Sequence, residues 1–182
     1  MTLNQVSPRP MSEADAFTDY TSATPPESVI TPTVNDEDVN HTIQTINSSV
    51  PWPGSTYIIR AASSANVLSL LNGNVVLASP GSRGATHWEC TESSGWLGFK
   101  EPASGRFLGF NFWGKLCCTG TKQLGWENFC ARMRPNGGCV LLMTHWERLW
   151  PVGWREEFGK QILAKVDKAP QDGIVWDFIK VG

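Results

Sequence analysis

Short apolar runs, separated by turn-forming residues, recur about every ten residues from Pro51 onward. Gly, Asn and Pro stand between the runs, and they supply the positive φ angles and fixed corners that tight turns need. Regular short strands joined by such turns predict an all-β sandwich or barrel. A long helix is not expected, because Pro151, Gly153 and Gly159 would interrupt one over 147–165. The expected strands are 56–60, 67–71, 74–78, 87–90, 96–99, 107–110, 115–118, 126–132 and 139–143.

A tryptophan followed by an acid occurs three times, and each pair closes a segment of similar make-up. The pairs are Trp88-Glu89, Trp126-Glu127 and Trp176-Asp177, at spacings of 38 and 50 residues. Residues 66–70 also align with residues 106–110, forty positions later. A spacing in this range indicates a structural unit repeated within the chain. Because the three tryptophans keep register and adjoin apolar residues, we expect all three to fill the core.

The third copy is longer than the others, with its extra residues mainly at 151–160 and 167–173. Its middle strands are expected at 148–150 and 161–163. Four strands in each of three copies give about twelve strands in total. That count and the threefold repeat predict a β-trefoil, a closed barrel of six strands capped by three hairpins.

The first fifty residues differ in composition from the rest of the chain. Residues 1–50 carry seven acids and one base, a net charge of −6, whereas residues 51–182 carry ten acids and fourteen bases, a net charge of +4. The first segment is rich in Ser, Thr and Pro and has almost no aromatics, so it cannot bury enough apolar surface to fold. We therefore expect a disordered acidic tail over 1–50 and a β-trefoil domain over 51–182.

Targeting signals and cysteine usage favour a cytoplasmic protein. The segment 1–10 shows no secretory or organellar pattern, and no apolar run is long enough to span a bilayer, so no membrane partner is expected. The five cysteines are an odd number set in apolar runs, which is typical of small buried hydrophobes. No Cys-x-x-Cys pair occurs, so neither a metal site nor a cofactor is expected. The cysteines are Cys90, Cys117, Cys118, Cys130 and Cys139.

Two motifs resemble known β-trefoils. The run Gly105-Arg106-Phe107-Leu108-Gly109 is similar to the fascin-like branch of the β-trefoil superfamily, in which a Gly-Arg-aromatic-Leu-Gly run follows a Ser or Gly turn. Trp126-Glu127 is similar to the closing tryptophan of that branch. The resemblance covers residues 57–181. It implies a module that binds a protein surface, with actin as the named example, and it leaves the oligomeric state open.

The ricin B-like lectins are a more distant resemblance. Their repeats close on Gln-x-Trp, and their sugar pockets use an Asp beside an aromatic side chain. Here Thr86, Leu124 and Ile174 stand two positions before the repeated tryptophans, and no Asp lies between Pro51 and Val166. An intracellular lectin that binds glycans through other groups is the first alternative, because trefoils vary their loops on a constant barrel.

Tryptophans outside the repeat register mark the candidate binding surface. Trp113 lies at an expected hairpin tip, and three others lie in the third lobe, where an insertion breaks the repeat. Tryptophan mixed with Arg and Glu in a loop is the composition of a recognition surface. The alternative is a small lobe-specific core beneath a long loop. The candidate ligand-binding residues are Trp113, Trp146, Trp150, Trp154, Arg148, Arg155 and Glu156.

No catalytic residue is proposed, because the sequence holds no recognisable Ser-His-Asp, phosphate-loop or paired-carboxylate motif. The tripeptide His-Trp-Glu occurs at 87–89 and 145–147, but at different phases of the repeat, and we expect a surface contact there. A small cyclase or isomerase acting on an apolar metabolite stays open as a second alternative. Nucleic acid is not an expected partner, since the basic residues are scattered. The main expectation is a non-catalytic module that recognises a protein through its third-lobe loops.

Overall fold

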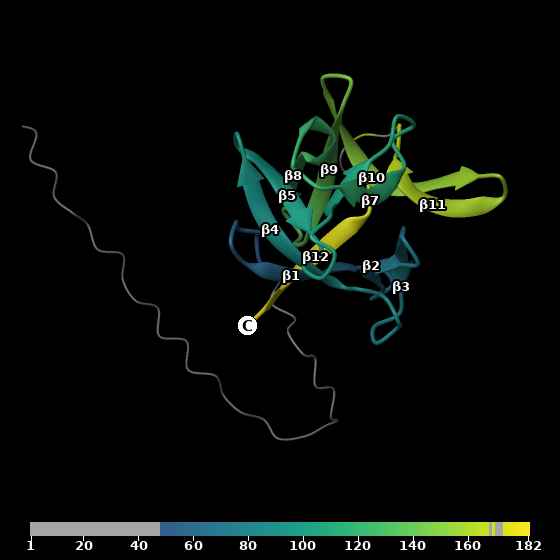
Figure 1. The fold of residues 1–182 in the computed structure, drawn as a ribbon. Coiled ribbons are helices and arrows are strands. Elements are labelled where there is room, and N and C mark those ends of the chain that lie inside the picture. Colours follow the sequence, from purple (N-terminus) through teal and green to yellow (C-terminus); the bar gives the residue numbers. More distant parts are fainter. Residues whose placement is uncertain (1–47, 168, 170–172) are drawn as a thin grey trace, which may run out of the picture. The chain divides into compact units, whose positions relative to one another are not determined.

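The computed structural model describes residues 48–167, 169 and 173–182. Within these residues the chain is all-β, with twelve strands and one short 3-10 helix, η1 (Gly125–Glu127), as predicted (Figure 1). The tail predicted over 1–50 lies outside the described residues except for its last three positions. The strands are β1 (Thr56–Ala61), β2 (Val67–Leu71), β3 (Asn74–Ala78), β4 (His87–Ser93), β5 (Trp96–Lys100), β6 (Phe107–Phe110), β7 (Leu116–Gly120), β8 (Phe129–Met133), β9 (Cys139–His145), β10 (Arg148–Glu157), β11 (Lys160–Lys165) and β12 (Val175–Val181).

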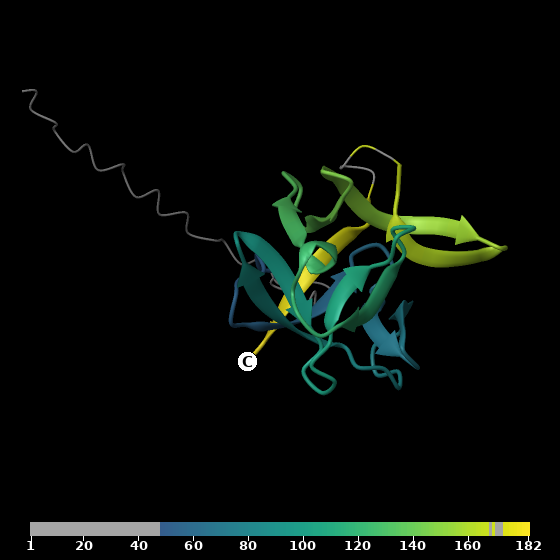
Figure 2. The ribbon, with the colours of Figure 1, turned by 45° about the horizontal axis from the view of Figure 1, so that its top comes forward.

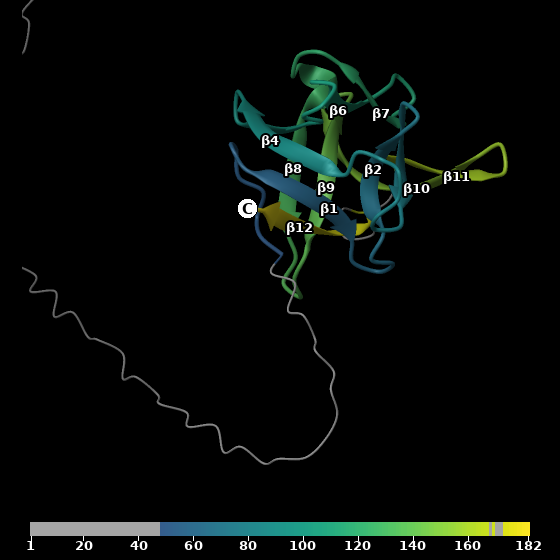
Figure 3. The same cartoon turned by 60° about the horizontal axis from the view of Figure 1, so that its bottom comes forward.

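Six of these strands close into a barrel. β1 pairs with β4, β4 with β5, β5 with β8, β8 with β9, β9 with β12 and β12 with β1, all antiparallel. The other six form the hairpins β2–β3, β6–β7 and β10–β11. Figure 3 shows β1 beside β12 and β8 beside β9 in the barrel, and Figure 2 shows the β10–β11 hairpin reaching beyond it. This arrangement confirms the predicted β-trefoil.

Four strand pairs are joined by two-residue turns in which both residues have a positive φ. Such turns match the right-handed twist of the strands and favour Gly at the second position. Three of the turns meet that preference, namely Asn72-Gly73, Ser94-Gly95 and Phe158-Gly159. The fourth, Trp146-Glu147 between β9 and β10, contains no glycine. It lies at the candidate site described below.

The third-lobe insertion is a long hairpin, not the loop that the sequence was expected to form. β10 and β11 pair from Val152↔Lys165 to Glu157↔Lys160. Proline has no N–H to donate, but β10 tolerates Pro151 because the hydrogen bond to the neighbouring segment uses its carbonyl, which accepts from the Val166 N–H at 3.0 Å. The expectation of third-lobe binding loops is therefore corrected: most of that surface is strand.

The core lies inside the barrel and is filled by large aromatic side chains. Trp88 on β4 and Trp176 on β12 are fully buried, as the repeat predicts. The side chain of Phe99 is also fully buried, and its ring packs against two others. Its centroid lies 5.7 Å from that of Phe178 and 6.0 Å from that of Phe129. These rings come from β5 and β8 of the second lobe and β12 of the third, and Trp88 on β4 belongs to the first, so the core joins all three lobes.

The expectation that Trp126 also fills the core is wrong, because its side chain is 51% exposed. The segment before β8 forms the turn η1, in which a carboxylate oxygen of Glu127 accepts a 3.1 Å hydrogen bond from the Leu124 N–H. β8 begins only at Phe129, whose fully buried ring takes the core position. Trp126 is left outside, stacked on Phe110.

A buried carboxylate organises the turn between β5 and β6, just before the run Gly105–Gly109. The two carboxylate oxygens of Glu101 accept hydrogen bonds of 2.8 and 2.7 Å from the N–H groups of Ala103 and Ser104. Gly105 follows with φ +67° and donates to the Glu101 carbonyl at 2.9 Å. Burial alone would raise the pKa of Glu101, but the hydrogen bonds from Ser104 and Ala103 outweigh burial and lower that pKa.

The variants Trp88→Phe and Trp176→Phe separate hydrogen bonding from packing in the core. Trp88 Nε1 donates a 3.0 Å bond to the buried Leu68 carbonyl, whereas the buried Trp176 Nε1 has no partner among the described residues. Only Trp88→Phe breaks a bond, so we expect it to lower the free energy of unfolding by about 1 kcal/mol more than Trp176→Phe. Urea unfolding measures both, with the exposed Trp126→Phe as control. Equal losses would contradict the difference.

The variant Glu101→Gln tests the turn through pH. Because the folded-state pKa is lowered, the carboxylate stabilises the fold above its ordinary pKa of 4.5, and this is lost as the pH falls through the lower folded-state value. We expect the variant to lose roughly 1–2 kcal/mol of unfolding free energy at neutral pH and less in acid. Urea unfolding across this range is the measurement, with the exposed Glu92→Gln as control. A loss of unfolding free energy that is the same at every pH would show that the charge of Glu101 does not stabilise the turn.

Candidate functional site

The structure divides the predicted site residues into two groups. Trp113 and Trp146, each 68% exposed, lie on either side of Phe112, whose ring meets their indoles edge-on at 5.1 and 5.7 Å. Trp154 and Glu156 are exposed on β10 and share one face of that strand. Of the first group Trp146 lines an aromatic pocket, and of the second Trp154 lines a different groove.

The other predicted residues hold β10 in place or face solvent. Trp150 packs half-buried against the core, and its Nε1 donates a 2.9 Å bond to the His145 carbonyl. Arg155 donates a 2.8 Å bond from Nη1 to the Trp113 carbonyl and so ties β10 to the β6–β7 turn. Arg148 is exposed at the first position of β10. Trp150 and Arg155 are thus engaged within the fold.

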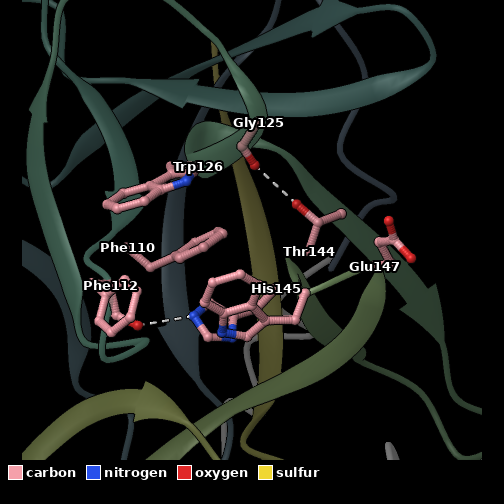
Figure 4. A pocket seen from close by; sticks show the side chains of 8 residues that line it. Phe110, Phe112, Gly125, Trp126, Thr144, His145 and Glu147 are labelled. Atoms are coloured by element: carbon pink, nitrogen blue, oxygen red, sulfur yellow. Dashed lines mark hydrogen bonds between the residues drawn. The ribbon is translucent and has the colours of Figure 1, made fainter.

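The aromatic pocket lies between η1, the end of β6 and the β9–β10 turn, and has a volume of about 230 Å³ (Figure 4). η1 brings Trp126 to it, because that tryptophan is excluded from the core. The β6–β7 tip brings Phe112, and the β9–β10 turn brings Trp146 and Glu147. The lining residues are Phe110, Phe112, Gly125, Trp126, Thr144, His145, Trp146 and Glu147.

Aromatic rings form the walls of this pocket. The indole of Trp126 lies nearly parallel to the ring of Phe110, with centroids 6.2 Å apart and an interplanar angle of 13° (Figure 4). Phe112 meets Trp146 at 88°. Trp126, Phe112 and Trp146 are all half exposed or more. A contiguous exposed group of large apolar side chains on a soluble domain marks a binding surface.

His145 locks two walls of the pocket together. The imidazole is buried, with Nε2 3.0 Å from the Phe112 carbonyl and Nδ1 3.1 Å from the Lys165 Nζ. A carbonyl can only accept, so Nε2 carries the hydrogen, and Nδ1 accepts from the Lys165 ammonium group. Lys165 also lies over the Trp150 ring, 4.8 Å from its centroid. Both ring nitrogens are therefore occupied by structural bonds, and the imidazole positions Phe112 opposite Trp146.

The turn that carries Trp146 and Glu147 is strained. Their φ angles are +50° and +60°, in the left-handed region that side chains with a Cβ atom disfavour. Each such residue costs on the order of 1–3 kcal/mol and persists only where the surrounding structure enforces it. This turn type favours Asn-Gly, yet Trp146 and Glu147 occupy it, and both side chains line the pocket. A contribution of these side chains to the pocket would explain why strained residues occur there.

Polar groups complete the pocket. Thr144 Oγ1 donates a 2.9 Å bond to the Gly125 carbonyl, which ties β9 to η1. Glu147 is exposed on the side of the pocket opposite Phe112, and its carboxylate makes no ion pair with any residue that the structure describes (Figure 4). The pocket thus combines flat apolar walls with a hydrogen-bond acceptor at its edge.

The described part of the chain offers neither a cluster of metal ligands nor an activated thiol. No three His, Cys, Asp or Glu side chains gather there as metal ligands would, and no helix there is long and apolar enough to cross a membrane. Three of the five cysteines are buried, as predicted, and two are half-buried. Burial, reinforced by Glu92, raises the pKa of Cys90 to about 12, and burial with Glu101 raises the pKa of Cys118 to about 11. Both thiols are protonated at neutral pH and are poor nucleophiles.

Phe112, Trp126 and Glu147 are site residues that the sequence reasoning missed. Phe112 carried a signal, since it adjoins Trp113 at the predicted hairpin tip. Trp126 carried one as well. Residues two apart on a strand share a face, and the residue two after each of the other repeated tryptophans is apolar, whereas polar Asn128 follows Trp126. Glu147 was noted only as part of the tripeptide at 145–147, where a surface contact was expected, because its place in a turn depends on the pairing of β9 with β10.

The variant Glu147→Gly tests the strain in the β9–β10 turn. Glycine adopts a positive φ freely, so the variant should relieve about 1–2 kcal/mol of backbone strain. This exceeds the conformational entropy that glycine loses on folding, and we therefore expect the unfolding free energy to rise by roughly 0.5–1 kcal/mol. Urea midpoints at unchanged m-value measure the gain. The reverse control is Gly73→Ala, at φ +77° with open space around it, which should lose stability. A loss of stability in Glu147→Gly would refute stored strain.

Solved structures that share the fold of this chain include a β-galactosidase and an endo-β-galactosidase. A GH43 β-1,3-galactosidase matches with a TM-score of 0.58 and 15% identity, over 73% of this chain and 28% of that protein. A GlcNAcα1-4Gal-releasing endo-β-galactosidase from Clostridium perfringens matches with a TM-score of 0.57 and 16% identity, over 70% of this chain and 33% of that protein. No protein-family model and no curated protein matches the chain. At these identities the likeness is one of fold, between an all-β domain and one part of each of these larger proteins.

Proposed function

We propose that this chain is a non-catalytic carbohydrate-binding module and that its aromatic pocket holds a sugar ring. The observation that carries the proposal is the pocket itself, in which exposed Trp126, Phe112 and Trp146 converge with the carboxylate of Glu147. The two structures of similar fold support it, because both belong to proteins named for release or cleavage of galactose-containing glycans. The lectin alternative from the sequence is thereby favoured over the protein-binding module.

The chemistry of the pocket fits a saccharide. One face of a pyranose ring is lined with C–H groups and stacks on an aromatic plane, while its hydroxyls donate to carboxylates and carbonyls. Trp126 or Trp146 supplies such a plane, and Glu147 is an acceptor at the edge. The volume of about 230 Å³ is below the roughly 300–1,000 Å³ of sites for drug-sized ligands, so the pocket suits one sugar unit.

The lining also favours binding over catalysis. Glycoside hydrolysis uses a pair of carboxylates on either side of the scissile bond. Glu147 is the one carboxylate among the residues that line the pocket. A cyclase or isomerase would need a closed apolar cavity, whereas the rings here are open to solvent.

The protein-binding expectation, with actin as its example, has less support. It relied on Arg148 and Arg155 as free recognition groups in a loop. Arg155 instead donates to the Trp113 carbonyl and lies 3.9 Å from Glu157. Neither of the two structures of similar fold is named as a fascin or an actin binder. Actin binding stays a prediction, and co-sedimentation of the chain with filaments tests it.

Titration calorimetry of the full chain with galactose-terminated disaccharides tests the glycan proposal. We expect saturable binding, and a loss of about tenfold or more in affinity for Trp126→Ala and for Trp146→Ala. Trp52→Ala is the matched control, because this tryptophan is 72% exposed and does not line the pocket. Glycan arrays extend the search to other sugars. Binding that survives both pocket variants, or no binding to any glycan on the array, would refute the proposal.

A further inference from the structure

A second hollow, which we call the lysine groove, lies on the hairpin side of the domain and shares no lining residue with the aromatic pocket. It has a volume of about 590 Å³ and runs between the β2–β3 and β10–β11 hairpins. Lys115, which directly precedes β7 in the β6–β7 hairpin, is also on its wall. β3 contacts β11 beside it. All three lobes therefore contribute to the groove.

Trp154 supplies a flat apolar platform in the lysine groove. It lies on β10 directly across from the buried Leu163 of β11, so the two side chains lie side by side on one face of the hairpin. The indole is nevertheless 43% exposed. Its neighbour Arg155 points to the opposite face of the strand, where it bonds to the Trp113 carbonyl, so the two side chains serve different surfaces.

The polar lining of the lysine groove is cationic and rich in amides. Lys115 and Lys160 line it, and neither forms an ion pair with a residue that the structure describes. Asn72, Asn74 and Gln161 add amide groups, and no carboxylate is among the lining residues. The residues that line the groove therefore carry two positive charges and no negative one, although the whole chain carries a net charge of −2.

Two acidic groups of β10 stand near this surface, because Glu157 lies directly across from Lys160 in the hairpin register and Glu156 is next to it. Glu156 is exposed on the same face of β10 as Trp154 and lies across from Gln161 in the hairpin register. It is outside the groove lining, toward the tip of the hairpin. Its charge opposes the two lysines and should repel an anion bound there.

We propose that the lysine groove binds an acidic oligosaccharide, one that carries carboxylate or sulfate groups. The C–H face of one sugar unit stacks on Trp154, the hydroxyls bond to the amides, and the anionic groups pair with Lys115 and Lys160. A flat face, a rim of hydroxyls and fixed negative charge match the three kinds of group that line the groove. An acidic peptide would match the charge alone and leave the indole without a flat partner.

This site would give the module a second specificity that the aromatic pocket lacks. The aromatic pocket has a carboxylate at its edge and so favours neutral sugars, whereas the groove favours anions. Because the two sites share no lining residue, either can fail without the other, and the two proposals can be tested separately on one protein.

Calorimetry of the full chain with a galacturonate tetrasaccharide, a sulfated galactose tetrasaccharide and a neutral galactose tetrasaccharide tests the lysine groove. For the acidic sugars we expect Trp154→Ala to lose roughly tenfold in affinity, and Lys115→Gln and Lys160→Gln to lose about threefold each. Glu156→Gln should bind them more tightly. The exposed Lys180→Gln on β12 is the control for net charge. Added salt should weaken this binding, since exposed charges are screened.

Three results would overturn the proposal. The first is equal affinity for the neutral and the acidic tetrasaccharides at this groove. The second is a loss in Lys180→Gln as large as that in Lys160→Gln, which would mean a general charge effect. The third is equally tight binding of a polyglutamate peptide with the same dependence on Trp154, which would assign the groove to acidic peptides. Lys160 is exposed beside a turn, so Lys160→Gln should not unfold the domain. Glu156→Gln is expected to raise the affinity for acidic sugars, which an unfolded variant could not do.

Discussion

The pairing of β1 with β12 is the constraint on which the rest of the domain depends. Six residue pairs, from Thr56↔Val181 to Ala61↔Trp176, join the two ends of the domain and close the barrel. The ion pair between Arg60 and Asp177, at 2.7 Å and largely buried, fixes the register between residues 117 positions apart. Without this closure the aromatic core would be open on one side. Such non-local pairing also implies slow folding compared with helical domains of similar size.

Closure of the barrel explains why the two candidate sites lie where they do. A closed barrel leaves only its turns and hairpins free to vary, so binding groups gather where neighbouring lobes meet. The aromatic pocket joins the closing turn of the second lobe to the first turn of the third. His145 is buried on the barrel strand β9 and hydrogen-bonded to the Phe112 carbonyl, so it holds that junction in a fixed position against the barrel. The strained turn after it is tolerated because the flanking strands hold it.

Much of the fold follows from the sequence, because it rests on local and periodic signals. The spacing of apolar runs and turn residues predicts the strands, and the repeated tryptophans predict three lobes. The failures occur where the repeat is broken. Trp126 keeps the register of Trp88 and Trp176 but is displaced by η1, a local turn that Glu127 stabilises. Residues 151–160 were expected as a loop, because Pro151 and the glycines suggested interruption and concealed the strand alternation on either side of Phe158-Gly159.

The candidate sites were harder to predict, because they depend on which lobes meet. Trp113, Trp146 and Trp154 were proposed as binding residues from the sequence, yet they lie in different parts of the fold. Trp113 is in the β6–β7 turn, Trp146 is in the β9–β10 turn and Trp154 is on β10, so their division between two surfaces follows from the strand pairing. Glu147 and Phe112 acquire a role only through long-range pairing that no local pattern records.

The reach of the β10–β11 hairpin has a consequence for association between copies of the chain. β11 is the last strand of its sheet, and its inner end is covered by the bridge between Lys115 and Ala164. Its outer end, from Lys160 to Ile162, is an edge on which another strand could pair. A lysine at such an edge opposes that pairing, since two copies would bring like charges together. The same charge that suits an acidic ligand therefore also protects the domain against edge-to-edge aggregation.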